Sequence, residues 1–167
     1  MRGPFDPREA LRVLTDHGVE FVVIGGIAAA VHGAPVPTFD VDVCYRRGPE
    51  NIDRLVAALR ELRAYLAGAP PGLPFQLDAK TITNSMNLTF DTTAGELDCL
   101  GDPAGVGGYE GLIANAERAE LGGLEVAVCA LEDLIRMKRA AGRPKDQQTL
   151  PFLDALLERI EERRKGG

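Results

Sequence analysis

Residues 21–45 read FVVIGGIAAAVHGAPVPTFDVDVCY, and this stretch decides the fold. Its first four residues, Phe21–Ile24, form a continuous apolar run, which is typical of a central strand buried on both faces. Gly25 and Gly26 follow directly, and the alanine-rich residues 27–31 predict a short helix packed against that strand. Glycine after a strand lets a phosphate approach the backbone, and the start of a helix offers unpaired N–H groups, although the pair is more often a plain turn.

Residues 39–45 alternate and predict a second strand, with Phe39 and Val41 on one face and Asp40 and Asp42 on the other. The two aspartates would then lie side by side, with Cα atoms roughly 6.6 Å apart. Carboxylates at that spacing can converge on Mg²⁺, which prefers hard oxygen ligands and substrate phosphates. A half-exposed strand with an acidic outer face is the alternative.

A third acid lies in a predicted hairpin formed by residues 86–90 and 96–100. Asp98 points to one side of the second strand, and its neighbours Leu97 and Cys99 point to the other. If this strand lies beside residues 39–45, Asp98 reaches the same cleft, where it completes a metal site or accepts a proton as general base. A solvent-facing carboxylate is the alternative.

The remaining pattern predicts an α+β domain spanning residues 1–167, with a mixed β-sheet flanked by helices and a C-terminal helical tail. Asp6 is a candidate N-cap for the first helix, with Pro7 at its first position. The other predicted elements are a helix over 49–65, a hairpin over 119–128 that turns at Gly122-Gly123, and helices over 131–141 and 145–163.

Composition narrows the class of protein without naming its function. The chain has 167 residues, a net charge of −6 and 26% charged residues, which is the balance of an ordinary globular protein. Cys44, Cys99 and Cys129 are far apart and form no CxxC pair, so we expect reduced structural thiols. The N-terminus is too polar for a signal peptide and no run is long enough to span a bilayer, so we expect a cytoplasmic protein without a membrane partner.

A basic stretch interrupts this acidic background, and its members are Arg136, Lys138, Arg139, Arg143 and Lys145. Such a stretch is usually a solvated helix face. It also suits a nucleic-acid acceptor, because neutralising phosphates drives such binding. The overall acidity and the shortage of aromatic residues for base stacking, 5% with no Trp, argue in the other direction.

Together these features resemble the DNA polymerase beta-like nucleotidyltransferase superfamily. Its signature is an apolar residue, Gly, then Gly or Ser, a spacer of about a dozen residues, and Asp-x-Asp between apolar residues. Here Ile24-Gly25-Gly26 is followed by thirteen residues and then by Asp40-Val41-Asp42-Val43, with Asp98 as the later single acid.

The resemblance extends over roughly residues 15–157 to the AbiE-type toxin nucleotidyltransferases of bacterial toxin–antitoxin systems. His32-Gly33 before Thr38 is similar to their approach to the acids, although Val36 stands near the place where many relatives carry Arg. Residues 131–138 and 143–146 are similar to their C-terminal lysine and Lys-Asp motifs. The resemblance implies that Lys138 contacts the triphosphate and that Asp146 is a second essential acid.

The implied function is Mg²⁺-dependent transfer of an NMP group from an NTP to an acceptor hydroxyl. The acceptor is a tRNA 3′ end first, a protein hydroxyl second and a small molecule third, and a cognate antitoxin protein is an expected partner. A catalytically silent nucleotide-binding or interaction module is the alternative. The expected nucleotide-binding residues are Gly25, Gly26, Thr38, Lys138, Arg143 and Lys145, the metal ligands are Asp40, Asp42 and Asp98, and the catalytic residues are these three acids with Lys138 and Asp146.

Overall fold

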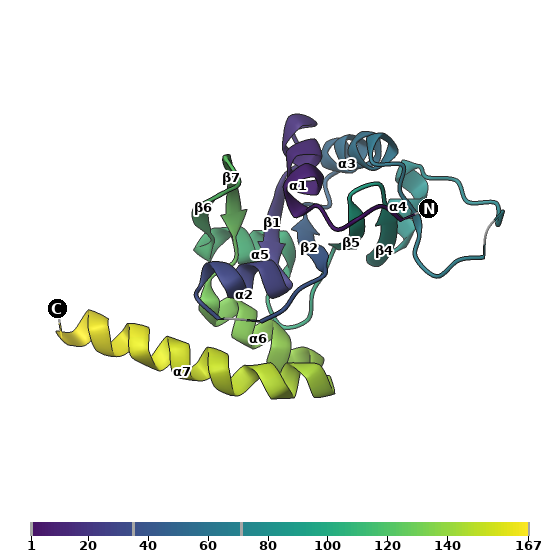
Figure 1. Cartoon of the computed structure of the whole chain (residues 1–167). Coiled ribbons are helices and arrows are strands. Elements are labelled where there is room, and N and C mark those ends of the chain that lie inside the picture. The colour runs from purple at the N-terminus through teal and green to yellow at the C-terminus, as the bar shows by residue number, and fades with distance from the viewer. Residues whose placement is uncertain (1, 35, 71, 167) are drawn as a thin grey trace.

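A mixed sheet forms the centre of the molecule (Figure 1). The computed structural model describes residues 2–34, 36–70 and 72–166, and within these ranges the sheet has seven strands in the order β3-β4-β5-β2-β1-β7-β6. The strands are β1 (Phe21–Ile24), β2 (Asp40–Tyr45), β3 (Tyr65–Leu66), β4 (Asn87–Thr92), β5 (Gly95–Leu100), β6 (Glu117–Leu121) and β7 (Leu124–Val128). The helices are α1 (Pro7–Asp16), α2 (Gly25–Val31), α3 (Pro49–Glu61), α4 (Ala79–Asn84), α5 (Gly108–Asn115), α6 (Leu131–Ala141) and α7 (Pro144–Gly166).

Two pairs of neighbouring strands run parallel, β2 with β5 and β1 with β7, and the other neighbours are antiparallel. The predicted α+β class, with a mixed sheet and a C-terminal helix, is therefore confirmed. Parallel neighbours need a long connection between them, and here the segment between β2 and β5 contains α3, α4 and two strands. This connection brings distant parts of the sequence together at the middle of the sheet.

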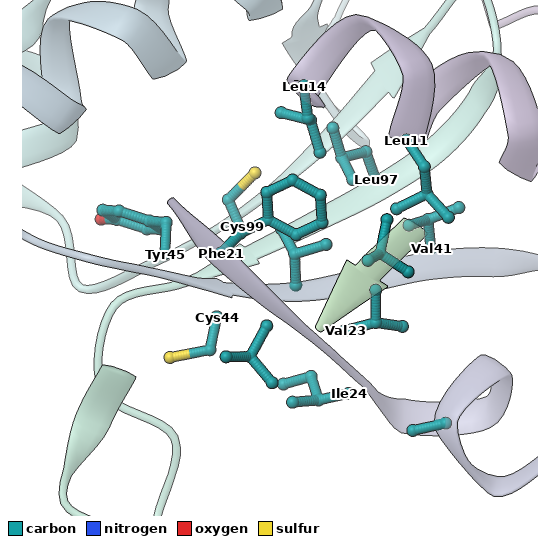
Figure 2. Packing of buried hydrophobic residues seen from close by; sticks show 14 of the residues in the cluster. Leu11, Leu14, Phe21, Val23, Ile24, Val41, Cys44, Tyr45, Leu97 and Cys99 are labelled. Atoms are coloured by element: carbon teal, nitrogen blue, oxygen red, sulfur yellow. The ribbon is translucent and has the colours of Figure 1, made fainter. Parts of the chain in front are cut away.

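The core lies on both faces of the sheet, and Figure 2 shows the part around β1 and β2. All four residues of β1 are buried, as its continuous apolar run predicts. Leu11 and Leu14 of α1 point into the same cluster as Val41 of β2 and Leu97 of β5. Removing these side chains from water is the main force that fixes α1 on the sheet. Cys44, Cys99 and Cys129 are buried free thiols, as expected.

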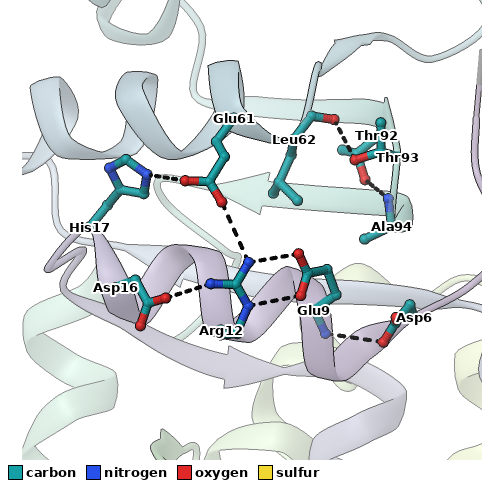
Figure 3. A network of polar contacts seen from close by, with 10 residues as sticks. All are labelled: Asp6, Glu9, Arg12, Asp16, His17, Glu61, Leu62, Thr92, Thr93 and Ala94. Atoms are coloured by element: carbon teal, nitrogen blue, oxygen red, sulfur yellow. Dashed lines mark hydrogen bonds and ion pairs between the residues drawn. The ribbon is translucent and has the colours of Figure 1, made fainter.

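A polar network joins α1 to α3 at the surface (Figure 3). Arg12 donates hydrogen bonds to Glu9 at 2.7 and 2.8 Å and to Asp16 at 2.6 Å. Glu61 of α3 lies 3.5 Å from the same guanidinium and 2.9 Å from Nε2 of His17. Exposed pairs of this kind contribute little individually, so the network adds orientation rather than much stability.

Residues 62–65 depart from the prediction of a helix over 49–65. Helix α3 ends at Glu61, and Arg63 takes a left-handed backbone conformation with φ of 51°. The chain then turns, and Tyr65 pairs with Asp91 at the edge of β4. Hydrogen bonding to an open sheet edge satisfies the backbone there, and it outweighs the helical periodicity of the side chains.

Both predicted hairpins are confirmed, β4 with β5 and β6 with β7, and the second turns at Gly122-Gly123. The short helices α4 and α5 were not predicted, and the last helix begins one residue earlier and ends three residues later than expected. Figure 1 shows α6 and α7 on the side of the sheet opposite α1 and α3, with the end of α7 reaching away from the strands. In the described ranges, no helix has the length and apolar character needed to cross a membrane.

Candidate active site

Three carboxylates meet at the centre of the sheet because of how β2 pairs. In the antiparallel pair with β1, Asp42 lies opposite Ile24, and in the parallel pair with β5 it lies opposite Asp98. Facing residues of neighbouring strands point to the same side of a sheet. Carboxylate oxygens of Asp40, Asp42 and Asp98 accordingly lie within 4.8 Å of one another. The strand that carries Asp98 therefore lies beside the Asp-x-Asp strand, which was the condition for Asp98 to reach the same cleft.

The electrostatics of this cluster favour a bound cation. Burial and the charge of Asp98 raise the pKa of Asp40. Burial and the neighbouring carboxylates raise the pKa of Asp42 to about 9. Oδ1 of Asp98 is buried and has no hydrogen-bond partner among the described residues. Three close oxygen donors with an unpaired buried atom fit a divalent cation, because its charge removes their repulsion and its coordination uses the free oxygen.

The two glycines let side chains approach the start of α2. Gly25 is the first residue of this helix and has φ of +70°, and a Cβ there would overlap Oδ2 of Asp42. A Cβ on Gly26 would lie 2.7 Å from Oγ1 of Thr38. Glycine is therefore required at both positions, because a side chain there would collide with Asp42 or Thr38. Phosphate binding at these glycines stays a prediction.

Thr38 and Phe39 lead into β2. The hydroxyl of Thr38 donates to the backbone oxygen of Asp40 at 3.1 Å and lies 3.4 Å from its Oδ1. The alternation of residues 39–45 predicted Phe39 on the same face as Val41. Val41 is buried, but Phe39 is 78% exposed, so this prediction is wrong for Phe39. The reason is that the pairing of β2 with β5 begins at Asp40, so this pairing does not hold Phe39, the preceding residue, against the core.

The junction of α6 and α7 holds a second group of charged side chains. Asp146 has a fully buried side chain and accepts a hydrogen bond from Nε of Arg143 at 2.8 Å. Its other oxygen lies 3.4 Å from Nζ of Lys138. Burial works to raise the pKa of Asp146, but the hydrogen bond from Arg143 and the charges of Arg143 and Lys138 lower it. Asp146 therefore stays ionised and fixes both cations.

A cavity of about 710 Å³ joins these groups. It is lined by all the predicted site residues except Asp146, namely Gly25, Gly26, Thr38, Asp40, Asp42, Asp98, Lys138, Arg143 and Lys145. Asp146 instead lies behind the wall, in contact with two residues that line it. The structure thus brings together the carboxylates, the glycine turn and three cations from four separate parts of the sequence.

Several lining residues were not expected from the sequence. Phe39 and Leu134 are the clearest of these. Phe39 directly precedes Asp40, and Leu134 lies one helical turn before Lys138. A check of the residues beside Asp40 and Lys138 could have found them. Asn87 and Pro103 also line the cavity, and they reach it only through the packing of distant segments, for which the sequence carries no local signal.

The basic stretch of α6 and α7 is largely neutralised. Arg136 pairs with the buried carboxylate of Asp133 at 2.9 Å, and Arg139 pairs with Asp154 at 2.8 Å. Lys138 and Arg143 share Asp146, as described above. Within the described ranges, Lys145 alone in this stretch has no ion-pair partner. Lys145 therefore brings an unpaired positive charge to the cavity, and a second group of cations without a described ion-pair partner, Arg159, Arg163, Arg164 and Lys165, lies exposed near the end of α7.

Solved structures share this architecture over nearly the whole chain. A solution structure of the antibiotic-resistance factor ANT(2'')-Ia matches with a TM-score of 0.54 and 14% identity, covering 95% of this chain and 90% of that chain. A proposed nucleotidyltransferase from Thermotoga maritima matches with a TM-score of 0.51 and 18% identity, covering 89% and 94%. The chain has the nucleotidyltransferase fold.

A third match with this fold contains a nucleotide-modified small molecule. It is the crystal structure of ANT(2'')-Ia in complex with adenylyl-2''-tobramycin, with a TM-score of 0.56, 14% identity, and coverage of 95% of this chain and 92% of that chain. No family model and no curated protein sequence matches the chain. At these identities the nucleotidyltransferase fold is what the likeness establishes.

Proposed function

We propose that this chain is a Mg²⁺-dependent nucleotidyltransferase, which moves an NMP group from an NTP to an acceptor hydroxyl. The observation that carries the proposal is the shared cavity, in which Asp40, Asp42 and Asp98 face cations from α6 and α7. Carboxylates and cations in one cleft suit a ligand that is itself a metal-bound polyphosphate. Positioning and electrostatic stabilisation account for most of the rate in such reactions.

Asp40, Asp42 and Asp98 are the residues that would hold Mg²⁺, which when bound supplies positive charge beside the phosphate oxygens. Lys138 and Lys145 bind the β- and γ-phosphates as point charges. Arg143, whose Nε is held by Asp146, presents the rest of its guanidinium to the same cavity. These cations also stabilise the negative charge that develops on the leaving group.

The reaction balances with the residues of the cavity. The oxygen of the acceptor hydroxyl forms a bond to the α-phosphorus, and the bond from that phosphorus to the bridging oxygen of the β-phosphate breaks. Pyrophosphate leaves with the electron pair of the broken bond. The hydroxyl proton passes to the carboxylate of Asp98, at the oxygen that does not hold the metal.

The proposed acceptor is a tRNA 3′ end, with Lys145 and Arg143 as the cations nearest to its phosphates. A small hydroxyl compound is the second candidate, and two observations favour it. Arg136 and Arg139 are engaged by carboxylates, which removes two cations of α6 from those that a nucleic acid could contact near the cavity. The ANT(2'')-Ia structure contains an adenylylated small molecule. A protein hydroxyl is the third candidate.

A role as the toxin of a toxin–antitoxin system, with a cognate antitoxin, is the biological part of the proposal. It rests on the sequence resemblance to the AbiE-type enzymes. Expression in bacteria tests it: growth should stop with the intact chain and continue with Asp40→Ala/Asp42→Ala. Equal growth with both chains would remove the toxin role and would leave the transfer reaction to be judged by itself.

The transfer assay is the deciding experiment. Purified protein, Mg²⁺ and each α-labelled NTP are incubated with total tRNA, with a protein extract or with a set of aminoglycosides, beside the Asp40→Ala/Asp42→Ala variant. We expect label in one acceptor class with the intact chain and none with the variant. Loss of transfer in EDTA and its return with Mg²⁺ would support the metal assignment.

A silent nucleotide-binding module predicts a different outcome. The intact chain would then bind Mg·NTP, for example by calorimetry, without transferring label to any acceptor. Unchanged NTP binding in the Asp40→Ala/Asp42→Ala variant would contradict the proposed metal site as well.

A further inference from the structure

Phe39 is an exposed aromatic residue inside the candidate active site. Its side chain is 78% exposed, more than any other large apolar side chain in the described ranges. It lines the cavity and directly precedes Asp40. A ring this exposed contributes little to folding, because the hydrophobic effect requires burial. The ring is thus available to whatever occupies the cavity.

The backbone that carries this ring is anchored on both sides. Thr38 donates its hydroxyl to the backbone oxygen of Asp40 at 3.1 Å, and its side chain packs onto Gly26, which has no room for a Cβ. Asp40 begins β2 and is paired with Glu96 of β5. Phe39 is held between these two fixed residues, so the backbone that carries the ring is in place before a ligand binds. Preorganisation of this kind lowers the entropy cost of binding.

The position of Phe39 also fits one part of the nucleotide. From the carboxylate cluster, β1 and the turn at Gly25 lie to one side, β5 with Asp98 lies to the other, and Phe39 lies beyond the start of β2. Under the proposed function, the phosphates extend toward the turn and the cations of α6 and α7. The acceptor hydroxyl approaches Asp98. The nucleoside is attached to the α-phosphate, and the remaining direction in which it can extend is toward Phe39.

We propose that Phe39 is the platform on which the base of the bound NTP stacks. This inference rests on the proposed function and adds to it the group that recognises the base. Val36 and Pro37 line the cavity beside Phe39 and extend the apolar surface. Stacking on a flat ring is tolerant of base identity, because every base has a π-face. Phe39 therefore favours nucleotides over other polyphosphates without selecting strongly among the four bases.

A fluorescence experiment can test this contact directly, because the chain contains no Trp. Phe39→Trp introduces a single tryptophan at the platform. Phe152→Trp is the matched control, since Phe152 is 67% exposed but does not line the cavity. We expect Mg·ATP to quench the emission of the first variant in a saturable way and to leave the second unchanged. Equal responses of the two variants would overturn the proposal.

A comparison of ligands separates the base from the phosphates. Calorimetry would measure Mg·ATP, Mg·GTP and Mg-tripolyphosphate with the intact chain, Phe39→Ala and Phe152→Ala. We expect Phe39→Ala to weaken both nucleotides roughly five- to hundredfold and to leave tripolyphosphate unchanged. Phe152→Ala should change neither. The exposure of both rings means that neither variant should unfold the chain.

The remaining outcomes distinguish this inference from the proposed function. If the intact chain binds nucleotide and tripolyphosphate equally and still transfers NMP, base stacking is wrong and the transferase proposal stands. If Phe39→Ala raises only the KM of the acceptor, the ring contacts the acceptor and the inference is again wrong. If the intact chain binds none of the three ligands, both proposals fail.

Discussion

Gly25 and Asp42 form the tightest contact of the candidate site. The glycine takes φ of +70° and leaves no space for a Cβ beside Oδ2 of Asp42. We expect Gly25→Ala to lower the free energy of unfolding by about 1–3 kcal/mol, since it adds backbone strain to a steric overlap. It should also displace Asp42 and weaken Mg²⁺ binding. Thermal unfolding and calorimetry with Mg²⁺ would measure the two effects.

Gly33→Ala is the control for backbone strain alone. Gly33 also has a positive φ, +99°, but a Cβ there would meet nothing within 4 Å. This variant should lose some stability and keep its Mg²⁺ affinity. If both variants bound Mg²⁺ equally, the contact between Gly25 and Asp42 would not matter for the metal site.

The raised pKa of Asp42 predicts a dependence of stability on pH. The folded chain holds this proton up to about pH 9, whereas the ordinary value in an unfolded chain is 3.8. Between these values the folded state binds more protons, so in EDTA the free energy of unfolding should fall as the pH rises from about 4 to 9. Mg²⁺ should reverse the fall, because it binds the deprotonated folded state.

Unfolding in urea at pH 5, 6.5 and 8, with EDTA or with Mg²⁺, would measure this dependence. Asp42→Asn should flatten the slope in EDTA and raise the stability at pH 8, because an amide of the same shape needs no proton uptake on folding. A stability in EDTA that increased steadily over this range in the intact chain would be inconsistent with a protonated carboxylate cluster.

At the level of elements, Asp146 joins α6 to the start of α7 and fixes two cations of the cavity. We expect Asp146→Asn to lower the free energy of unfolding by about 1.5–3 kcal/mol, the range for hydrogen bonds to charged groups. Lys138 and Arg143 would then lose their fixed positions, so the KM for NTP should rise by more than kcat falls. Asp146 would act as a positioning residue in that case.

Asp154→Asn provides the matched control on the same helix. Asp154 also accepts from an arginine of α6, Arg139, but it is 38% exposed and does not line the cavity. An exposed pair contributes about 0–1 kcal/mol, and the KM for NTP should not change. If Asp146→Asn lowered kcat severely at an unchanged KM, the role of Asp146 as a catalytic acid would be favoured instead.

Elements with a strong local pattern were predictable, and those set by their neighbours were not. The apolar run of β1, the alternation of β2 and the Gly122-Gly123 turn each carry their structure in a few adjacent residues. Residues 62–65 continue a helical pattern, yet pairing with the edge of β4 makes Tyr65 part of a strand. The short helices α4 and α5 carry too few periodic residues to stand out from loops.

The candidate site shows the same division between local and distant information. Asp40 and Asp42 were predictable as a pair because both lie on one strand. Asp98 was predictable only on the condition that β5 lies beside β2, and strand order is set by packing across the whole sheet. Only the family resemblance pointed to Asp146 as an acid of the site, and it did not indicate that its carboxylate is engaged by Arg143 and Lys138 behind the cavity wall.

At the scale of the whole molecule, the two halves of α7 make different contributions. Leu153 is fully buried against the core, whereas residues 161–166 are exposed. A chain ending at residue 160 should therefore keep its stability within about 0.5 kcal/mol and bind Mg·NTP normally. A chain ending at residue 150 loses Leu153 and the partly buried Leu156, Leu157 and Ile160, so it should be destabilised by more than the roughly 2–5 kcal/mol that truncation of one buried leucine costs.

Thermal melts and calorimetry with Mg·ATP on the two shortened chains would test this division. A large loss of stability on removing only residues 161–167 would mean that the end of α7 has a packing role, as between two copies of the chain. Gel filtration of both chains would then show whether such an association exists.

The parallel pairing of β2 with β5 has a consequence for the synthesis of the protein. Asp42 leaves the ribosome long before Asp98, and the cations of α6 and α7 follow later still. A nascent chain holds an incomplete set of cavity-lining residues until the start of α7 has emerged. The candidate pocket is then formed only after the start of α7 has been made, so any chemistry that it performs cannot begin on a shorter nascent chain.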